Sequence, residues 1–152
     1  MAKIIAVCGS PASGKTTSAN RLSVQLAAAG YKPLVISLDN YYLERGDDRY
    51  PRDENGKPDW ESLKALNIEL FNENMNDLIN GKEVNLPTFD FVTGKRKFDE
   101  KPTKLEKSSI MVIEGIHGLN EELTHTIPKD KKFKIYVKII CVCTKVLENI
   151  CF

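Results

Sequence analysis

Short apolar runs along the chain alternate with segments in which apolar residues return every three or four positions. The mostly apolar runs at 4–8, 34–38 and 110–113 have the length and composition of buried parallel strands. Between the first two runs, apolar residues keep a helical spacing up to Gly30, a residue type that commonly ends helices. The positions are Ala19, Leu22, Leu26 and Ala29. The first 38 residues therefore predict a β-loop-α-β unit.

The rest of the chain continues this alternation. Apolar residues from 68 to 79 again follow a helical spacing and stop before Gly81. An apolar segment around Pro87 and a polar turn at 93–96 predict a hairpin of two short edge strands over 84–98. Apolar and mostly lysine positions alternate over 132–139, which predicts a further strand.

These elements predict an α/β fold in which helices flank a mainly parallel sheet, with the small hairpin near 84–98 as an excursion. In such sheets, ligands bind at the carboxyl ends of the strands. The polar, turn-rich residues 43–59 are interpreted as a long surface excursion. Long structured loops of this kind often carry function.

A glycine-rich motif directly follows the first predicted strand. Residues 9–16 fit G-x-x-x-x-G-K-[ST], the phosphate loop of P-loop NTPases, in the strand-before, helix-after context that it requires. Lys15 would reach the β- and γ-phosphates of ATP or GTP, and the Thr16 hydroxyl would hold Mg²⁺. A glycine-rich turn opening an ordinary helix is the less favoured alternative. The expected nucleotide-binding residues are Gly9, Ser10, Pro11, Ala12, Ser13, Gly14, Lys15, Thr16 and Thr17.

Two carboxylates follow predicted strands at the edge of the sheet where the phosphate loop lies. Glu114 closes the run 110–113, where an acid commonly supports the metal ion directly or through water. Asp39 ends the run 34–38, and beside a γ-phosphate it can accept a proton from an attacking hydroxyl while lying near Mg²⁺. A turn or capping role for Glu114, and an Asx turn with Asn40 for Asp39, stay open from spacing alone.

Length and charge narrow the classes of protein. The 152 residues fit one domain, 1–152, and 22 basic against 21 acidic side chains leave a net charge of +1. This balance gives no sign of a nucleic-acid or membrane partner. The chain shows neither an apolar run near the ~20 residues of a membrane span nor a signal-peptide pattern, which favours a cytoplasmic protein. The four cysteines lack metal-site spacing, so buried or reduced thiols are the favoured interpretation.

Five segments occur in a characteristic order: the phosphate loop, SLDNYY at 37–42, KPD at 57–59, LPTFDFVT at 86–93 and VIEGI at 112–116. In this order and composition the chain resembles uridine kinase-like enzymes of the phosphoribulokinase/uridine kinase family over residues 3 to about 138. Five ordered motifs are far more specific than the phosphate loop alone, which many classes of nucleotide-binding protein share.

The resemblance implies phosphoryl transfer from ATP to the 5′-hydroxyl of a nucleoside. Asp39 would be the general base, with Lys15 as its catalytic partner on the triphosphate. Thr16, Asp39 and Glu114 would support Mg²⁺. The residues expected to approach the substrate are Tyr42, Asp59, Phe89 and Arg96, although a solvated turn explains Arg96 equally well.

The chain departs from this family at two places. Phe89 stands where uridine kinases usually have a tyrosine and Gly94 where a histidine is common, which weakens the expectation of uridine specificity. Related kinases also place arginines in a lid after the fourth strand, but no arginine follows Arg96, and the atypical residues 139–152 suggest truncation or an altered reading frame. A lid arginine contributes ~10³ to 10⁵ in rate, so we expect nucleotide binding with weak or absent turnover.

Other functions remain as alternatives. The chain could be a kinase of another small alcohol, similar to phosphoribulokinase or pantothenate kinase, or an ATP-binding chain without catalysis. An RNA-binding module rests only on short basic turns, and the near-zero net charge argues against it. A small-molecule nucleoside is the expected partner, and homo-oligomerisation stays open. Trp60 is expected to anchor the long excursion more than to stack on a base, and His117 and His125, in a helical region expected after Glu114, receive no role.

Overall fold

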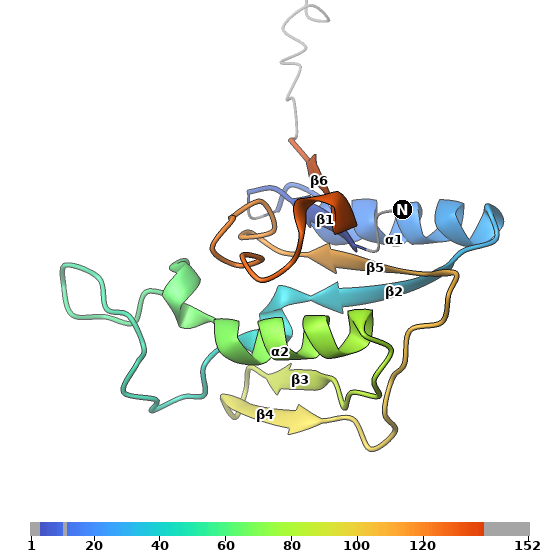
Figure 1. The fold of residues 1–152 in the computed structure, drawn as a ribbon. Coiled ribbons are helices and arrows are strands. Elements are labelled where there is room, and N and C mark those ends of the chain that lie inside the picture. The colour runs from blue at the N-terminus through green and yellow to red at the C-terminus, as the bar shows by residue number, and fades with distance from the viewer. Residues whose placement is uncertain (1–3, 11, 139–152) are drawn as a thin grey trace, which may run out of the picture.

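The fold is known from a computed structural model that describes residues 4–10 and 12–138. Its main sheet has four parallel strands in the order β2-β5-β1-β6 (Figure 1). They are β1 (Ile4–Cys8), β2 (Lys32–Ser37), β5 (Ser109–Glu114) and β6 (Lys132–Tyr136). The predicted parallel sheet is confirmed, with β2 beginning and ending slightly earlier than its apolar run. Position 139 of the last predicted strand lies outside the described residues.

Two helices lie on opposite faces of this sheet (Figure 1): α1 (Lys15–Ala28) and α2 (Ile68–Ile79). Both were predicted from apolar spacing. Side chains alternate between the faces of a strand, so Met111 and Ile113 of β5 join the core cluster that contains the α2 residues, and Val112 packs with Ala19 of α1. Within the described part of the chain, no helix is both long and apolar enough to cross a membrane.

The predicted hairpin forms a separate two-stranded antiparallel sheet of β3 (Pro87–Asp90) and β4 (Lys95–Phe98), next to α2 in Figure 1. Its turn lies two residues earlier than expected. The Asp90 carboxylate accepts the N–H groups of Val92 and Thr93, and the Asp90 carbonyl accepts the Gly94 N–H at 2.7 Å. Because Asp90 organises the turn in this way, residues 95 and 96 belong to β4.

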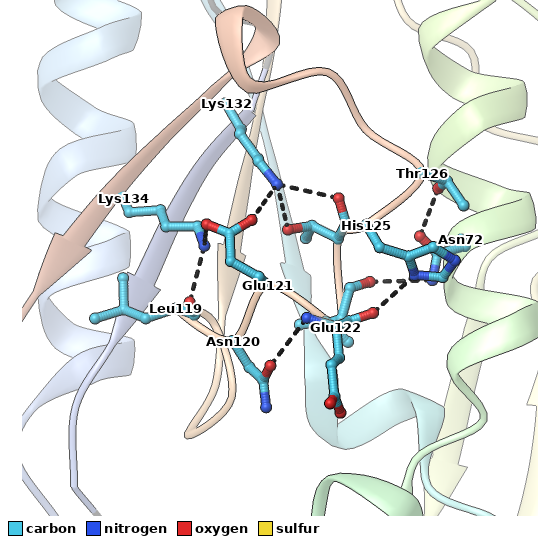
Figure 2. A network of polar contacts seen from close by, with 11 residues as sticks. Asn72, Leu119, Asn120, Glu121, Glu122, His125, Thr126, Lys132 and Lys134 are labelled. Carbon is cyan, nitrogen blue, oxygen red and sulfur yellow. Dashed lines mark hydrogen bonds and ion pairs between the residues drawn. The ribbon is translucent and has the colours of Figure 1, made fainter.

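The segment after β5 forms turns where a helix was expected, followed by the short 3₁₀ helix Lys129–Lys131. Figure 2 shows the polar network that connects this segment to β6. Lys132, only 5% exposed, donates to Glu121 at 2.9 Å and to both oxygens of Thr124, while Lys134 donates to the other Glu121 oxygen at 2.6 Å. These contacts between turn and strand stabilise the segment, in which backbone hydrogen bonds such as Thr124 N–H to the Glu121 carbonyl at 3.2 Å close single turns.

Candidate active site

The phosphate loop connects the carboxyl end of β1 to the N-terminus of α1. A Cβ atom built on Gly9 would lie 2.4 Å from both the Ser13 Oγ and the Val137 carbonyl oxygen, so only glycine fits there. Ala12 and Gly14 have positive φ angles of 58° and 81°, and the Ser13 N–H donates to the Ser10 carbonyl at 3.1 Å. The chain therefore curls tightly at this point, as a phosphate loop requires. Pro11, one of the predicted binding residues, lies outside the described residues.

The loop has the properties of an anion site. The first turn of α1 has no acidic residue, and none of the described side chains caps its N-terminus, so its N–H groups and positive dipole end stay available to a phosphate. Lys15 Nζ donates to the Ser10 carbonyl at 3.0 Å, which keeps the cation folded over the loop. The Ser13 hydroxyl is buried and has no partner among the described residues. These groups fit the phosphates of a nucleotide.

Glu114, at the end of β5, is held by hydroxyls from two other elements. Its side chain is only 6% exposed. Ser37 Oγ, at the end of β2, donates to Oε1 at 2.5 Å, and Thr16 Oγ1, in the first turn of α1, donates to Oε2 at 3.2 Å. Parallel pairing of β2 with β5 places Ser37 directly opposite Glu114. The structure thus brings together two of the residues predicted to support a metal ion, Thr16 and Glu114.

Asp39 lies just beyond β2, in a 3₁₀ helix (Leu38–Tyr41) whose N-terminus is capped by the Ser37 side chain. The Asp39 N–H reaches Ser37 Oγ at 3.4 Å. Asp39 is an exposed residue. Partial burial of its carboxylate nevertheless raises the pKa of Asp39 from its ordinary value of 3.8. The negative charge of Glu114 raises this pKa further, and the positive charge of Lys15 opposes both effects. Asp39 is therefore electrostatically coupled to the phosphate loop and to Glu114.

Asp39 also lines a cavity of about 340 Å³ whose walls are mainly aromatic. The rings come from the 3₁₀ region, the long excursion and the hairpin, and they are Tyr42, Trp60, Phe89 and Phe91. The Tyr42 ring contacts the other three with centroid distances of 5.9 to 6.4 Å. Burial, followed by the charge of Asp39, raises the pKa of Tyr42, as expected for a ring beside that carboxylate. Predicted substrate residues Tyr42 and Phe89 are thus placed together.

Two further predicted substrate residues lie elsewhere. The Asp59 carboxylate accepts the Glu61 N–H at 3.0 Å and is not part of the cavity lining. Arg96 donates from Nη2 to the Tyr42 carbonyl and from its backbone N–H to Glu44, and it lines a neighbouring polar cavity. Arg96 therefore supports the backbone behind the aromatic cavity. Trp60 lines the cavity and contacts Tyr50 edge-on at a centroid distance of 4.8 Å, which fits the anchoring role expected for it.

Sequence reasoning missed three residues of this site: Ser37, Arg45 and Phe91, whose ring lines the cavity beside Phe89. Ser37 carries a recognisable signal, because a serine two positions before Asp39 is a typical N-terminal cap. Arg45 lines the aromatic cavity, but no sequence signal identifies it. Its contact with the hairpin joins segments that are far apart in the sequence.

The donor set at this edge fits Mg²⁺ bound together with a nucleotide. Hydroxyl and carboxylate oxygens from Thr16, Glu114 and the nearby Asp39 are the hard ligands that Mg²⁺ prefers, and Mg²⁺ usually takes only one or two carboxylates plus phosphate oxygens. Among the described residues, no group of three or more His, Cys, Asp or Glu side chains could hold a metal ion without such a nucleotide.

Comparisons with known proteins connect the sequence and the fold of this chain with one family. The model of the phosphoribulokinase/uridine kinase family matches residues 4–145. Uridine kinase of Macrococcus caseolyticus is 33% identical over 116 residues, 76% of this chain and 53% of that protein, and uridine kinase of Borrelia duttonii is 32% identical over 122 residues, 80% and 55%. The chain spans about half the length of these curated relatives. A solved structure described as a possible uridine kinase from Bacillus stearothermophilus has the same fold, with a TM-score of 0.68 at 24% identity over 89% of this chain and 70% of that one.

Proposed function

Because this chain belongs to the phosphoribulokinase/uridine kinase family, we propose that it transfers the γ-phosphoryl group of ATP to the 5′-hydroxyl of a nucleoside. One observation carries the proposal. Asp39 lies between the two parts of the site, since its backbone N–H contacts Ser37 Oγ, which donates to Glu114, and it also lines the aromatic cavity. An alcohol bound among the aromatic rings would present its hydroxyl to this carboxylate, opposite the triphosphate.

In this proposal each side chain has a separate task. The N–H groups of the loop and Lys15 bind the β- and γ-phosphates and hold the γ-phosphorus in line with the acceptor oxygen. Asp39 accepts the proton of the attacking hydroxyl, and its raised pKa makes it a stronger base than an ordinary aspartate. The aromatic rings exclude water from the acceptor and stack on its flat part.

Thr16 and Glu114 would hold Mg²⁺, which supplies charge neutralisation for the phosphates when bound. In the structure these two residues already share a hydrogen bond, with Ser37 fixing the other carboxylate oxygen. The site therefore enters the reaction with its metal-supporting carboxylate oriented, which reduces the reorganisation needed when the nucleotide binds.

The test compares wild type with Asp39→Asn. Calorimetry measures the affinity for ATP and GTP with Mg²⁺, and mass spectrometry detects phosphorylated products from uridine, cytidine and a panel of other small alcohols. Loss of a general base costs about 10²- to 10⁴-fold in turnover, while ATP affinity should stay within a few-fold. Asp99→Asn, at an exposed position after β4, is the matched control and should leave both quantities unchanged.

Equal turnover in wild type and Asp39→Asn would remove Asp39 as the base. If product forms only from an alcohol that is not a nucleoside, the proposed phosphoryl transfer would stand and the proposed nucleoside acceptor would be wrong.

A second candidate is an ATP-binding chain with weak turnover. It is favoured by the engagement of the Arg96 guanidinium with the Tyr42 carbonyl, which holds this cation behind the aromatic cavity. Lys15 is then the cation that the structure places at the phosphate loop. ATP affinity in calorimetry with no detectable product from any acceptor in the panel would select this candidate.

A further inference from the structure

Arg45 occupies a special place in the aromatic cavity. Among the described residues that line this cavity it is the only basic one. It also lines the two neighbouring cavities of the excursion, so its side chain stands at the point where the three meet. Asp39, the acidic group of the cavity, is assigned to the reacting hydroxyl in the proposed function. Arg45 is thus available for another part of the acceptor.

The hairpin turn fixes the backbone and the Cβ atom of Arg45 in position. The Arg45 N–H donates to the Gly94 carbonyl at 2.8 Å. A Cβ atom built on Gly94 would lie 2.6 Å from the Arg45 Cβ and 3.0 Å from its Nε, so the side chain of Arg45 fills the space that any residue other than glycine would need. Gly94 also has a φ of +68°, which disfavours other residues. The excursion and the hairpin tip therefore fit together as one wall of the cavity.

The guanidinium group of Arg45 can form further hydrogen bonds. Among the described residues its guanidinium makes one hydrogen bond, a long one of 3.4 Å from Nη2 to the Phe91 carbonyl. A guanidinium has five N–H donors and no acceptor, so most of its donors remain for a ligand. The Tyr42 hydroxyl, in contrast, already donates to the Trp60 carbonyl at 3.1 Å.

The cavity therefore offers a ligand aromatic faces and, from Arg45, hydrogen-bond donors only. We propose that Arg45 is the residue that determines acceptor specificity, by donating to carbonyl oxygens on the edge of a flat base. A base that presents a carbonyl there, as uracil does, pairs with Arg45. A base that presents an amino group there, as cytosine does, would direct a donor at a donor and leave the guanidinium unpaired. This inference rests on the proposed function, because it assumes that the acceptor is a nucleoside.

The test uses equilibrium binding, so it does not depend on turnover. Trp60 is the only tryptophan of the chain and lines the cavity, so its fluorescence reports ligand binding directly. Wild type, Arg45→Met and Arg45→Lys are titrated with uridine and with cytidine, and ATP affinity is measured in parallel. Arg21→Met removes the same charge from an exposed position on α1 and serves as the control.

Wild type should bind uridine about tenfold or more tightly than cytidine, since a hydrogen bond to a charged group contributes at least that factor. Arg45→Met should lose this preference by weakening uridine about tenfold while cytidine changes less than about twofold. Arg45→Lys keeps the charge but loses the planar fork, so its preference should be intermediate. Arg21→Met should behave as wild type, and ATP affinity should be the same in all four proteins.

Uridine and cytidine affinities whose ratio is unchanged in Arg45→Met would overturn this inference and leave the proposed function standing. If that variant does not fold, Arg45→Lys decides in the same way, because a fully retained preference would exclude recognition by the guanidinium fork. Wild type that binds ATP but neither nucleoside would overturn the nucleoside part of the proposed function, and this inference with it.

Discussion

Replacing Ser37 by alanine removes a hydroxyl that contacts both the Glu114 carboxylate and the backbone N–H of Asp39 in the candidate active site. Ser37 Oγ donates to Glu114 at 2.5 Å and receives a long contact of 3.4 Å from the Asp39 N–H. Two matched variants separate its contributions. Ser37→Thr keeps the hydroxyl on a residue suited to a strand. Ser109→Ala removes a buried hydroxyl that accepts a neutral N–H from Glu106 at 2.9 Å.

The expected magnitude follows from the type of hydrogen bond. A hydrogen bond to a charged group contributes about 1.5–3 kcal/mol and a neutral one about 0.5–1.5 kcal/mol. Glu114 is 6% exposed, so water replaces the lost donor poorly, and the contact to Asp39 is too long to add much. Ser37→Ala should therefore lower the free energy of unfolding by about 2 kcal/mol, and Ser109→Ala by about 1 kcal/mol. At this chain length 2 kcal/mol corresponds to roughly 4–8 °C in Tm.

Urea denaturation followed by circular dichroism measures these differences, with Ser37→Thr expected within about 0.5 kcal/mol of wild type, the usual range of a tolerated substitution. A calorimetric titration also measures the effect of Ser37→Ala on ATP binding. Ser37→Ala should weaken ATP binding in the presence of Mg²⁺ and leave metal-free ATP binding unchanged, because the hydroxyl orients Glu114, which we propose to support the metal ion. The reasoning is refuted if Ser37→Ala and Ser109→Ala lose equal stability, or if ATP binding weakens equally with and without Mg²⁺.

Two more predictions concern the phosphate loop and the network of Figure 2. Gly9→Ala should abolish detectable ATP binding in calorimetry, because the added Cβ would lie 2.4 Å from Ser13 Oγ and from a backbone carbonyl. Gly56→Ala, in the excursion, has no atom near the added Cβ, and although its φ of +75° makes alanine strained there, it should bind ATP like wild type. Hydrogen bonds from Lys134 and then Lys132 lower the pKa of Glu121 from 4.5 to about 2, so its ionised form stabilises the fold above pH 4.5 and this stabilisation disappears as the pH falls to about 2. Glu121→Gln should therefore be less stable than wild type in urea at pH 7, with the difference vanishing near pH 2, and a difference that does not depend on pH would contradict this assignment.

The elements that could be predicted are those whose signal is local. The apolar runs of β1 and β5 and the spacing of α2 reflect burial on a sheet or on one helix face, which a periodic pattern records directly. The phosphate loop is also local, since strand, glycine turn and helix follow one another in the sequence. The turn of the hairpin was displaced because the Asp90 carboxylate competes for nearby N–H groups, a side-chain effect that glycine position alone does not reveal.

The conformation of the segment after β5 could not be predicted from its own sequence pattern. A helix was expected there, but Lys132 and Lys134 of β6 reach back to Glu121 and Thr124 and stabilise a series of turns. The almost complete burial of the Lys132 side chain depends on β6 pairing with β1, which no pattern within the turn itself encodes.

The sequence by itself determined the strands, the helices, the phosphate loop and the candidate carboxylates Asp39 and Glu114. Only the tertiary structure decided that Ser37 orients Glu114, that Arg96 lies behind the aromatic cavity, and that Arg45 lines this cavity next to Gly94. The physical reason is the strand order. Because β5 lies between β1 and β2, the carboxyl ends of three strands meet at one edge and join side chains such as Ser37 and Glu114, which are 77 positions apart in the chain. Hydrogen bonds and steric contacts act over a few ångströms in space, so sequence patterns that extend over one element do not report them.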